Sequence, residues 1–107
     1  MIEKRRARRA QLDIYLNKYV GGVPYLARTS DISPTGVALA HLIEPSHGDP
    51  RVGLQFQLPG SLELIYVEGE VVRRWAGKNC DRSGVRFTLI AERHRKLIGE
   101  FVERAAA

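Results

Sequence analysis

Apolar and polar residues alternate along most of this chain with a period of two, which is typical of β-strands buried on one face. Two stretches show it clearly, one with apolar residues at Leu12, Ile14 and Leu16 and one at Leu54, Phe56 and Leu58. The pattern predicts strands over residues 12–19, 25–30, 37–42, 54–58 and 85–88, and one long strand or two over residues 62–75.

Turn-forming residues separate these predicted strands. Gly21 and Gly22 lie in the segment VGGVP, where glycine can adopt the positive φ angles of a hairpin turn. The segments DISPTG, IEPSHGDPRVG, PGS and AGKNCDRSG are rich in turn formers and are predicted to be turns or loops. Gly69 is predicted to mark a bulge or bend. Short strands at regular spacing favour a sandwich or a small barrel that closes to avoid exposed edges.

The period becomes helical near the C-terminus. From about residue 91, the apolar residues Leu97, Ile98, Phe101 and Val102 fall on one side of a helix, with charged residues largely opposite. A length of 107 residues leaves no room for a second domain with its own core. We expect one domain with a basic tail over residues 1–11, a barrel over residues 12–90 and an amphipathic helix over residues 91–107.

Composition narrows the class of protein. With 44% hydrophobic and 27% charged residues, the chain has the composition of an ordinary globular protein. Its one cysteine, Cys80, cannot form an internal disulfide, which favours a reducing compartment. The charged residues after Met1 disfavour a secretory signal peptide, and no apolar run approaches the roughly 20 residues of a membrane span. We therefore expect a cytoplasmic protein without a membrane span.

Positive charge is concentrated at the N-terminus. The chain has 17 Lys and Arg against 12 Asp and Glu, and five of the basic residues but only one acidic residue lie within residues 1–10. The rest of the chain is nearly balanced, whereas proteins that coat nucleic acid usually spread their positive charge over a face or groove. This distribution favours a small anion held by the tail.

Two segments carry candidate binding chemistry. Arg5 and Arg9 are four positions apart, which separates them by about 13 Å on one side of an extended chain or about 6 Å on one face of a helical turn. An arginine fork can donate two parallel hydrogen bonds to phosphate or to the O6 and N7 edge of guanine. In DISPTG, Asp31 could accept from guanine nitrogens, Ser33 adds a hydroxyl on the same side, and Gly36 lets the backbone approach a ligand. Together they predict a site for an anionic molecule that carries guanine.

Each segment alone also has a simpler interpretation. The arginine segment could be a solvated basic tail, and DISPTG could be a turn whose side chains form hydrogen bonds with their own backbone. In combination they resemble the PilZ domain family, whose signatures are Arg-x-x-x-Arg near the start and Asp/Asn-x-Ser-x-x-Gly about one hairpin later. Arg5 to Arg9 and Asp31 to Gly36 match both, in order. The segments GEVVRRW and SGVRFT also resemble late strands of that family, and the closing helix falls where the family has one.

The resemblance implies a mainly β protein, a six-stranded antiparallel β-barrel with a C-terminal α-helix, that binds the bacterial second messenger cyclic di-GMP. By position, Arg5 and Arg9 would hold phosphate and the guanine Hoogsteen edge. Asp31 and Ser33 would hold the other guanine edge, and Gly36 would shape the turn.

Arg6, Arg8 and Arg74 are further candidates for ligand contact. The ligand could bind singly or as a stacked pair, and no other cofactor is expected. We expect the tail to fold across the barrel when the ligand bridges it to the Asp31–Gly36 turn, which would signal to a downstream partner protein. Ordering the tail costs on the order of 1–2 kcal/mol per residue, so only a ligand with several charge-assisted hydrogen bonds can offset it.

Two other classes stay open. A nucleic-acid-binding barrel of the OB or Sm type would use the basic tail on phosphates and stack bases on Trp75 or on Tyr15, Tyr19, Tyr25 and Tyr66. A ligand-free interaction module would need none of the candidate residues. Catalysis is not expected, because Ser33 lacks the Gly-x-Ser-x-Gly context of a serine nucleophile. A metal site is not expected either, because the histidines and Cys80 lack metal-ligand spacing.

Overall fold

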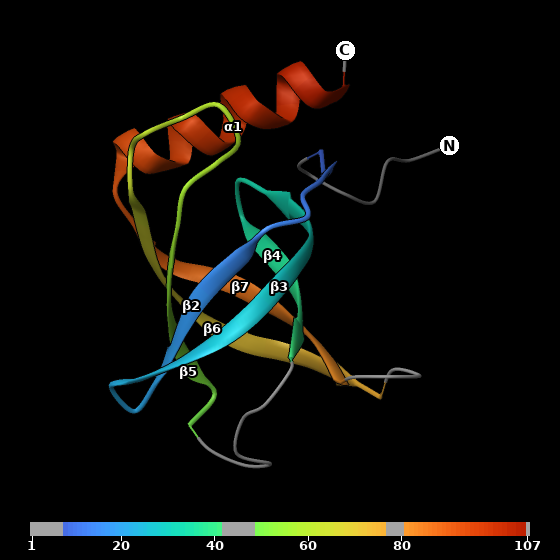
Figure 1. The fold of residues 1–107 in the computed structure, drawn as a ribbon, viewed down its shortest axis with the longest axis vertical. Coiled ribbons are helices and arrows are strands. Elements are labelled where there is room, and N and C mark those ends of the chain that lie inside the picture. The colour runs from blue at the N-terminus through green and yellow to red at the C-terminus, as the bar shows by residue number, and fades with distance from the viewer. Residues whose placement is uncertain (1–7, 42–48, 77–80, 107) are drawn as a thin grey trace.

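The computed structural model describes residues 8–41, 49–76 and 81–106, which form seven strands and one helix (Figure 1). The helix is α1 (Glu92–Ala106). The strands are β1 (Ala10–Gln11), β2 (Tyr15–Val20), β3 (Val23–Ser33), β4 (Gly36–His41), β5 (Arg51–Phe56), β6 (Ile65–Trp75) and β7 (Asp81–Ile90).

Six of the strands close into a barrel in which every neighbouring pair is antiparallel. The order around the sheet is β3-β2-β5-β6-β7-β4, and pairing of β4 with β3 completes the ring. The short strand β1 pairs with the C-terminal end of β3. The expected fold, a mainly β six-stranded antiparallel barrel with a C-terminal helix, is confirmed. Closure pairs the strands on both sides and so removes the exposed edges of an open sheet.

The inward positions of the strands build one apolar core. Leu39, Leu54 and Val67 are each at most 1% exposed, and burying a side chain of this kind contributes roughly 1.5–3 kcal/mol. Helix α1 lies across one end of the barrel and packs against β1 and β3 (Figure 1), where Ile98 and Val102 complete the core. In the part of the chain that the structure describes, no helix is long and apolar enough to cross a membrane.

Among the residues that the structure describes, three of the five buried polar side chains contact one another inside the barrel. Lys18, His41 and Ser83 are at most 6% exposed. The Lys18 Nζ lies 3.3 Å from His41 Nδ1, and His41 Nε2 lies 2.5 Å from Ser83 Oγ. Because a buried polar group is costly unless it is hydrogen-bonded, these contacts favour one arrangement of β2, β4 and β7.

The hairpin between β2 and β3 follows the sequence prediction, and several strand bounds do not. Gly21 and Gly22 have φ angles of 58° and 82°, as a two-residue turn requires. However, β3 continues to Ser33 instead of stopping at residue 30, β5 begins at Arg51 within a predicted loop, and β7 spans ten residues instead of four. These extra residues pair with neighbouring strands, and such pairing depends on residues far away in sequence. The predicted end of the third strand at residue 42 lies outside the described residues.

Ser30 on β3 and Val72 on β6 are β-bulges, that is, extra residues with no opposite number on the neighbouring strand. Each bulge changes which face of the sheet the following residues of its strand occupy. Ser30 is skipped in the backbone pairing of β3 with β4, since Thr29 pairs with Leu39 and Asp31 pairs with Ala38. Val72 is skipped in the same way on β6. A third register shift occurs at Gly69, as predicted, although the extra residue there belongs to β7. Since side chains alternate with a period of two, each extra residue reverses the expected inside and outside positions beyond it.

Candidate functional site

Arg9 and Asp31, which are 22 positions apart in the sequence, form an ion pair on the outside of the barrel. Gln11 of β1 pairs with Asp31 of β3, so Arg9 lies beside the end of β3. The Arg9 Nε donates to Asp31 Oδ1 at 2.5 Å, and the two side chains are 28% and 37% exposed. The fold therefore brings together one residue from each of the two predicted binding segments.

The extra residue Ser30 decides that Asp31 faces outward. Thr29 points into the barrel and is 4% exposed. With simple alternation, Asp31 would also point inward, where an unpaired carboxylate is strongly disfavoured. The bulge at Ser30 instead aligns Asp31 with Ala38, on the outer side of β4. Bulges commonly redirect side chains in this way next to functional sites.

Ser33 and Gly36 shape the tight turn between β3 and β4. The Ser33 Oγ accepts a hydrogen bond from the Thr35 backbone N–H at 3.2 Å and donates to the Gly36 carbonyl at 3.4 Å. Ser33 is only 1% exposed. A Cβ on Gly36 would lie 2.5 Å from the Val85 carbonyl oxygen, so a larger residue would force β4 and β7 apart.

A pocket of about 800 Å³ opens beside this turn, over the outer faces of β3, β4, β6 and β7. Its floor carries small residues, which are Gly36, Ala38 and Gly84. Around them stand Arg9, Asp31, Arg73, Trp75, Arg82 and Arg86. Four arginines against one aspartate make this a strongly basic pocket.

One aromatic ring stands at the edge of the pocket. Trp75 is 40% exposed, and the Arg73 guanidinium lies 5.1 Å from the centre of its ring. An exposed indole face of this kind can stack on a planar base. The sequence analysis named Trp75 as a base-stacking residue of a nucleic-acid-binding barrel, and its position at the pocket is compatible with stacking.

The other predicted ligand residues differ in where they lie. Arg5 and Arg6 are outside the described residues. Arg8 lies 3.7 Å from Glu103 of α1, with both side chains exposed. Arg74 does not line the pocket, whereas its neighbour Arg73 does.

The bulge at Val72 explains why Arg73 lines the pocket and the predicted Arg74 does not. Arg73 pairs with the outward Gly84, and Arg74 pairs with the inward Ser83. Strict alternation from the buried first half of β6 would have predicted the opposite.

Sequence reasoning missed Arg82 and Arg86 as site residues. Both face outward from β7 and flank the buried Val85 and Ser83. The signal was present, because arginines alternate with inward residues in DRSGVRF. It was not recognised because most of that segment was predicted to be a turn.

A second surface ion pair provides a natural comparison for Arg9 and Asp31. Arg28 donates to Asp13 at 2.5 Å and 2.8 Å, away from the basic pocket. The hydrogen bond from Arg28 lowers the pKa of the Asp13 carboxyl below its ordinary value, and the positive charge adds to this effect.

Among the described residues, no group of three or more His, Cys, Asp or Glu is arranged to hold a metal ion.

Comparison by sequence identifies a family. The family model described as the PilZ domain matches residues 3–104. No curated protein is a significant match to the chain.

Comparison of structures finds the same fold at low sequence identity. MotI/DgrA, the inhibitor of motility of Bacillus subtilis, has a TM-score of 0.85 and 17% identity, with 96% of this chain and 51% of that chain covered. This chain thus spans about half the length of MotI. The PilZ domain of YcgR from Escherichia coli with c-di-GMP has a TM-score of 0.72 and 10% identity, covering 97% of this chain and 92% of that one. The MrkH–c-di-GMP complex of K. pneumonia has a TM-score of 0.73 and 19% identity, covering 96% and 52%.

Proposed function

This chain belongs to the PilZ domain family, and we propose that it is a receptor that binds cyclic di-GMP in the basic pocket beside the β3–β4 turn. The observation that carries the proposal is the meeting of Arg9 and Asp31 at that pocket. Each comes from one of the two family signatures, and the chain between them forms the first hairpin of the barrel.

The pocket has chemistry that suits this ligand. Cyclic di-GMP is a dianion with two guanines, and the pocket offers four arginines that can donate to phosphate or to the guanine Hoogsteen edge. Asp31 offers a carboxylate for the guanine amino and imino groups, and Trp75 offers a ring face for stacking. The described E. coli and K. pneumonia structures with this fold were obtained with c-di-GMP, which supports the same ligand class here.

In this proposal the residues have distinct roles. Arg5 and Arg9 bind phosphate and the Hoogsteen edge, and Asp31 binds the opposite guanine edge. Ser33 and Gly36 act mainly on the turn, since the Ser33 hydroxyl is already engaged with Thr35 and Gly36. We expect Arg73, Arg82 and Arg86 to assist binding from the far side of the pocket, with Arg6, Arg8 and Arg74 less directly involved.

Ligand binding would change the contact between the N-terminal segment and the barrel. Arg9 and Asp31 are bonded to each other through Nε and Oδ1, and in this proposal that bond is exchanged for bonds to cyclic di-GMP. The segment before β1 would then follow Arg9 onto the ligand, and the new surface would be presented to a downstream protein. Backbone NMR tests this step, because a segment over residues 1–11 with the same order with and without saturating ligand would contradict it.

Calorimetric titration with cyclic di-GMP at near-physiological salt tests the receptor function. We expect micromolar or tighter binding that Arg9→Ala and Asp31→Ala weaken by at least several-fold, whereas Arg28→Ala, which breaks the matched ion pair outside the pocket, leaves it intact. The chain has a single tryptophan, so the fluorescence of Trp75 should change as the pocket fills. Absence of binding by the folded protein would refute the proposal. Binding of single-stranded nucleic acid that falls steeply with salt and ignores Asp31→Ala would instead favour a nucleic-acid barrel.

A further inference from the structure

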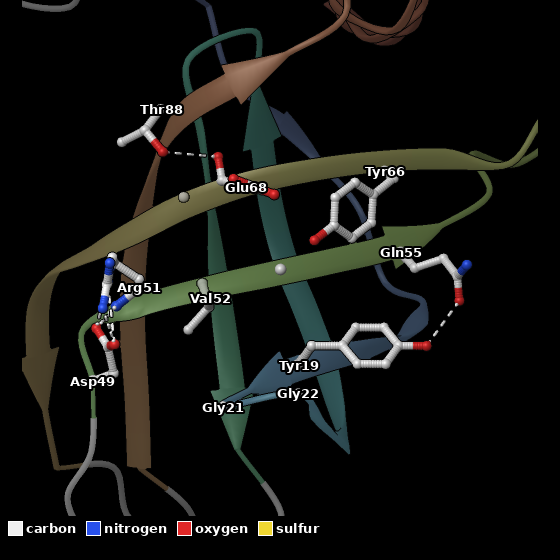
Figure 2. A pocket seen from close by; sticks show the side chains of 12 residues that line it. Tyr19, Gly21, Gly22, Asp49, Arg51, Val52, Gln55, Tyr66, Glu68 and Thr88 are labelled. Carbon is white, nitrogen blue, oxygen red and sulfur yellow. Dashed lines mark hydrogen bonds and ion pairs between the residues drawn. The ribbon is translucent and has the colours of Figure 1, made fainter.

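A second hollow, of about 600 Å³, lies on the outer faces of β2, β5 and β6 (Figure 2). None of the residues that line it also lines the basic pocket. Outward positions of an antiparallel sheet are usually polar, yet here Tyr19 and Tyr66 face outward on either side of β5. Tyr66 is 44% exposed, and Leu64, which lies just before β6, is 52% exposed. Tyrosines exposed on a sheet face are a common feature of protein interfaces.

Gly53 forms the floor between the two tyrosine rings. It pairs with Tyr19 on one side and with Glu68 on the other. A Cβ at Gly53 would lie 2.5 Å from the Tyr66 hydroxyl oxygen, so the Tyr66 ring extends across the bare backbone there. The Tyr19 hydroxyl donates to the Gln55 side-chain oxygen at 3.4 Å. The hollow therefore has the Tyr19 and Tyr66 rings on either side of β5, and the Tyr66 ring covers the buried Gly53 (Figure 2).

The charges at the hollow leave one carboxylate unbalanced. Arg51 is held by Asp49, with nitrogen–oxygen distances of 2.7–3.1 Å. Glu68 has no ion pair within residues 8–41, 49–76 and 81–106. Burial raises the pKa of the Tyr66 hydroxyl, and the negative charge of Glu68 raises it further. The Glu68 carboxylate is therefore close enough to interact with the Tyr66 hydroxyl. The hollow thus carries the opposite sign from the basic pocket, although the whole chain has a net charge of +5.

We propose that this hollow docks an extended basic segment of a partner protein, with an arginine or lysine side chain between Tyr19 and Tyr66 and its charged end at Glu68. Faces of aromatic rings attract cations, and a neighbouring carboxylate adds to that attraction. The charge complementarity selects a basic segment over an acidic one. This inference does not depend on the proposed ligand function, because its residues take no part in the basic pocket.

A nitrogen-15 NMR titration of the whole chain with a short, capped peptide of alternating glycine and arginine tests the inference. We expect saturable shifts of the backbone amides of Tyr19, Gly53 and Tyr66. Glu68→Gln keeps the shape of the side chain and should weaken peptide binding about two- to five-fold, the effect of one partly exposed charge pair. Glu100→Gln removes the same charge from α1 and should have no effect. Tyr19→Leu, which removes one ring wall, should also weaken binding.

Several outcomes would overturn this inference. These are unchanged amides in β2, β5 and β6, equal binding by the parent and Glu68→Gln, and the same shifts from a peptide of alternating glycine and glutamate. Shifts that depend on protein concentration without peptide would assign the hollow to a second copy of the chain instead. Titration of Glu68→Gln with cyclic di-GMP separates the two proposals, because the variant should keep ligand binding if both are correct. Peptide binding in a chain that binds no cyclic di-GMP would refute only the receptor function.

Discussion

Replacing Asp31 by asparagine tests the proposed binding site most directly. Asp31→Asn keeps the size of the side chain but removes its charge and half of its acceptor capacity. In the free protein it removes the charge attraction from the 2.5 Å contact with Arg9, although the amide Oδ1 can still accept from the Arg9 Nε. In the complex it places an amide N–H₂ opposite guanine groups that are themselves donors, where the carboxylate would accept two hydrogen bonds.

These two effects change the affinity for cyclic di-GMP in opposite directions, and their magnitudes decide whether Asp31→Asn binds the ligand more weakly or more tightly. The Arg9–Asp31 pair is partly exposed, at 28% and 37%, and is worth about 0.2–1 kcal/mol. Its loss frees Arg9 for phosphate and favours binding by at most that amount. The lost carboxylate–guanine contact is worth about 1–3 kcal/mol. The net expectation is about 1–2 kcal/mol weaker binding, which is a factor of about 5–30 in affinity.

Calorimetry of the parent and of Asp31→Asn measures this difference. Asp13→Asn serves as the control, because it breaks an aspartate–arginine pair with the same 2.5 Å distance outside the pocket. The melting temperature of Asp31→Asn should fall by only a few degrees, since about 1 kcal/mol shifts it by roughly 4–8 °C in a domain of this size. If the parent binds cyclic di-GMP and Asp31→Asn binds it equally well or more tightly, then Asp31 does not contact the ligand and the proposed roles are wrong.

Three further predictions concern stability and charge. Gly36→Ala should lower the free energy of unfolding by about 1–3 kcal/mol in urea denaturation, because its Cβ would lie 2.5 Å from a β7 carbonyl oxygen, whereas Gly99→Ala on α1, with no atom within 4 Å, should not destabilise; equal stability of the two variants would contradict the reasoning. Ser83→Ala should cost about 1–3 kcal/mol by removing a hydrogen-bond partner inside the barrel, and an unchanged urea midpoint would mean that this bond contributes nothing. The hydrogen bond from Arg51 lowers the pKa of Asp49 from 3.8 to about 2, so the stabilisation from this pair is complete above pH about 4 and is lost as the pH falls toward 2. An NMR titration of the carboxyl carbon should show that midpoint, and Arg51→Ala should return it to the ordinary value.

The sequence by itself determined the fold class and the positions of the candidate binding residues along the chain. Alternation of apolar residues predicts strands because a side chain every second residue reaches the same face. Gly21 and Gly22 predict the first hairpin because few other residues adopt positive φ. The spacing within residues 5–9 and 31–36 identified the family signatures, since each motif is local. Of these candidates, the described residues place Arg9 and Asp31 together and place Ser33 and Gly36 in the adjoining turn.

Only the tertiary structure decided which side chains share a face at the pocket. The bulge at Ser30 turns Asp31 outward, and the bulge at Val72 brings Arg73 rather than Arg74 to the pocket. Arg82 and Arg86 join it from β7, more than 70 residues from Arg9 along the chain. A bulge exists only relative to the partner strand, and the local sequence does not specify which residue stays unpaired. The separation of a basic pocket from an acidic, tyrosine-lined hollow likewise results from closing six strands into one ring, because closure directs residues that are close in sequence to different sides of the barrel.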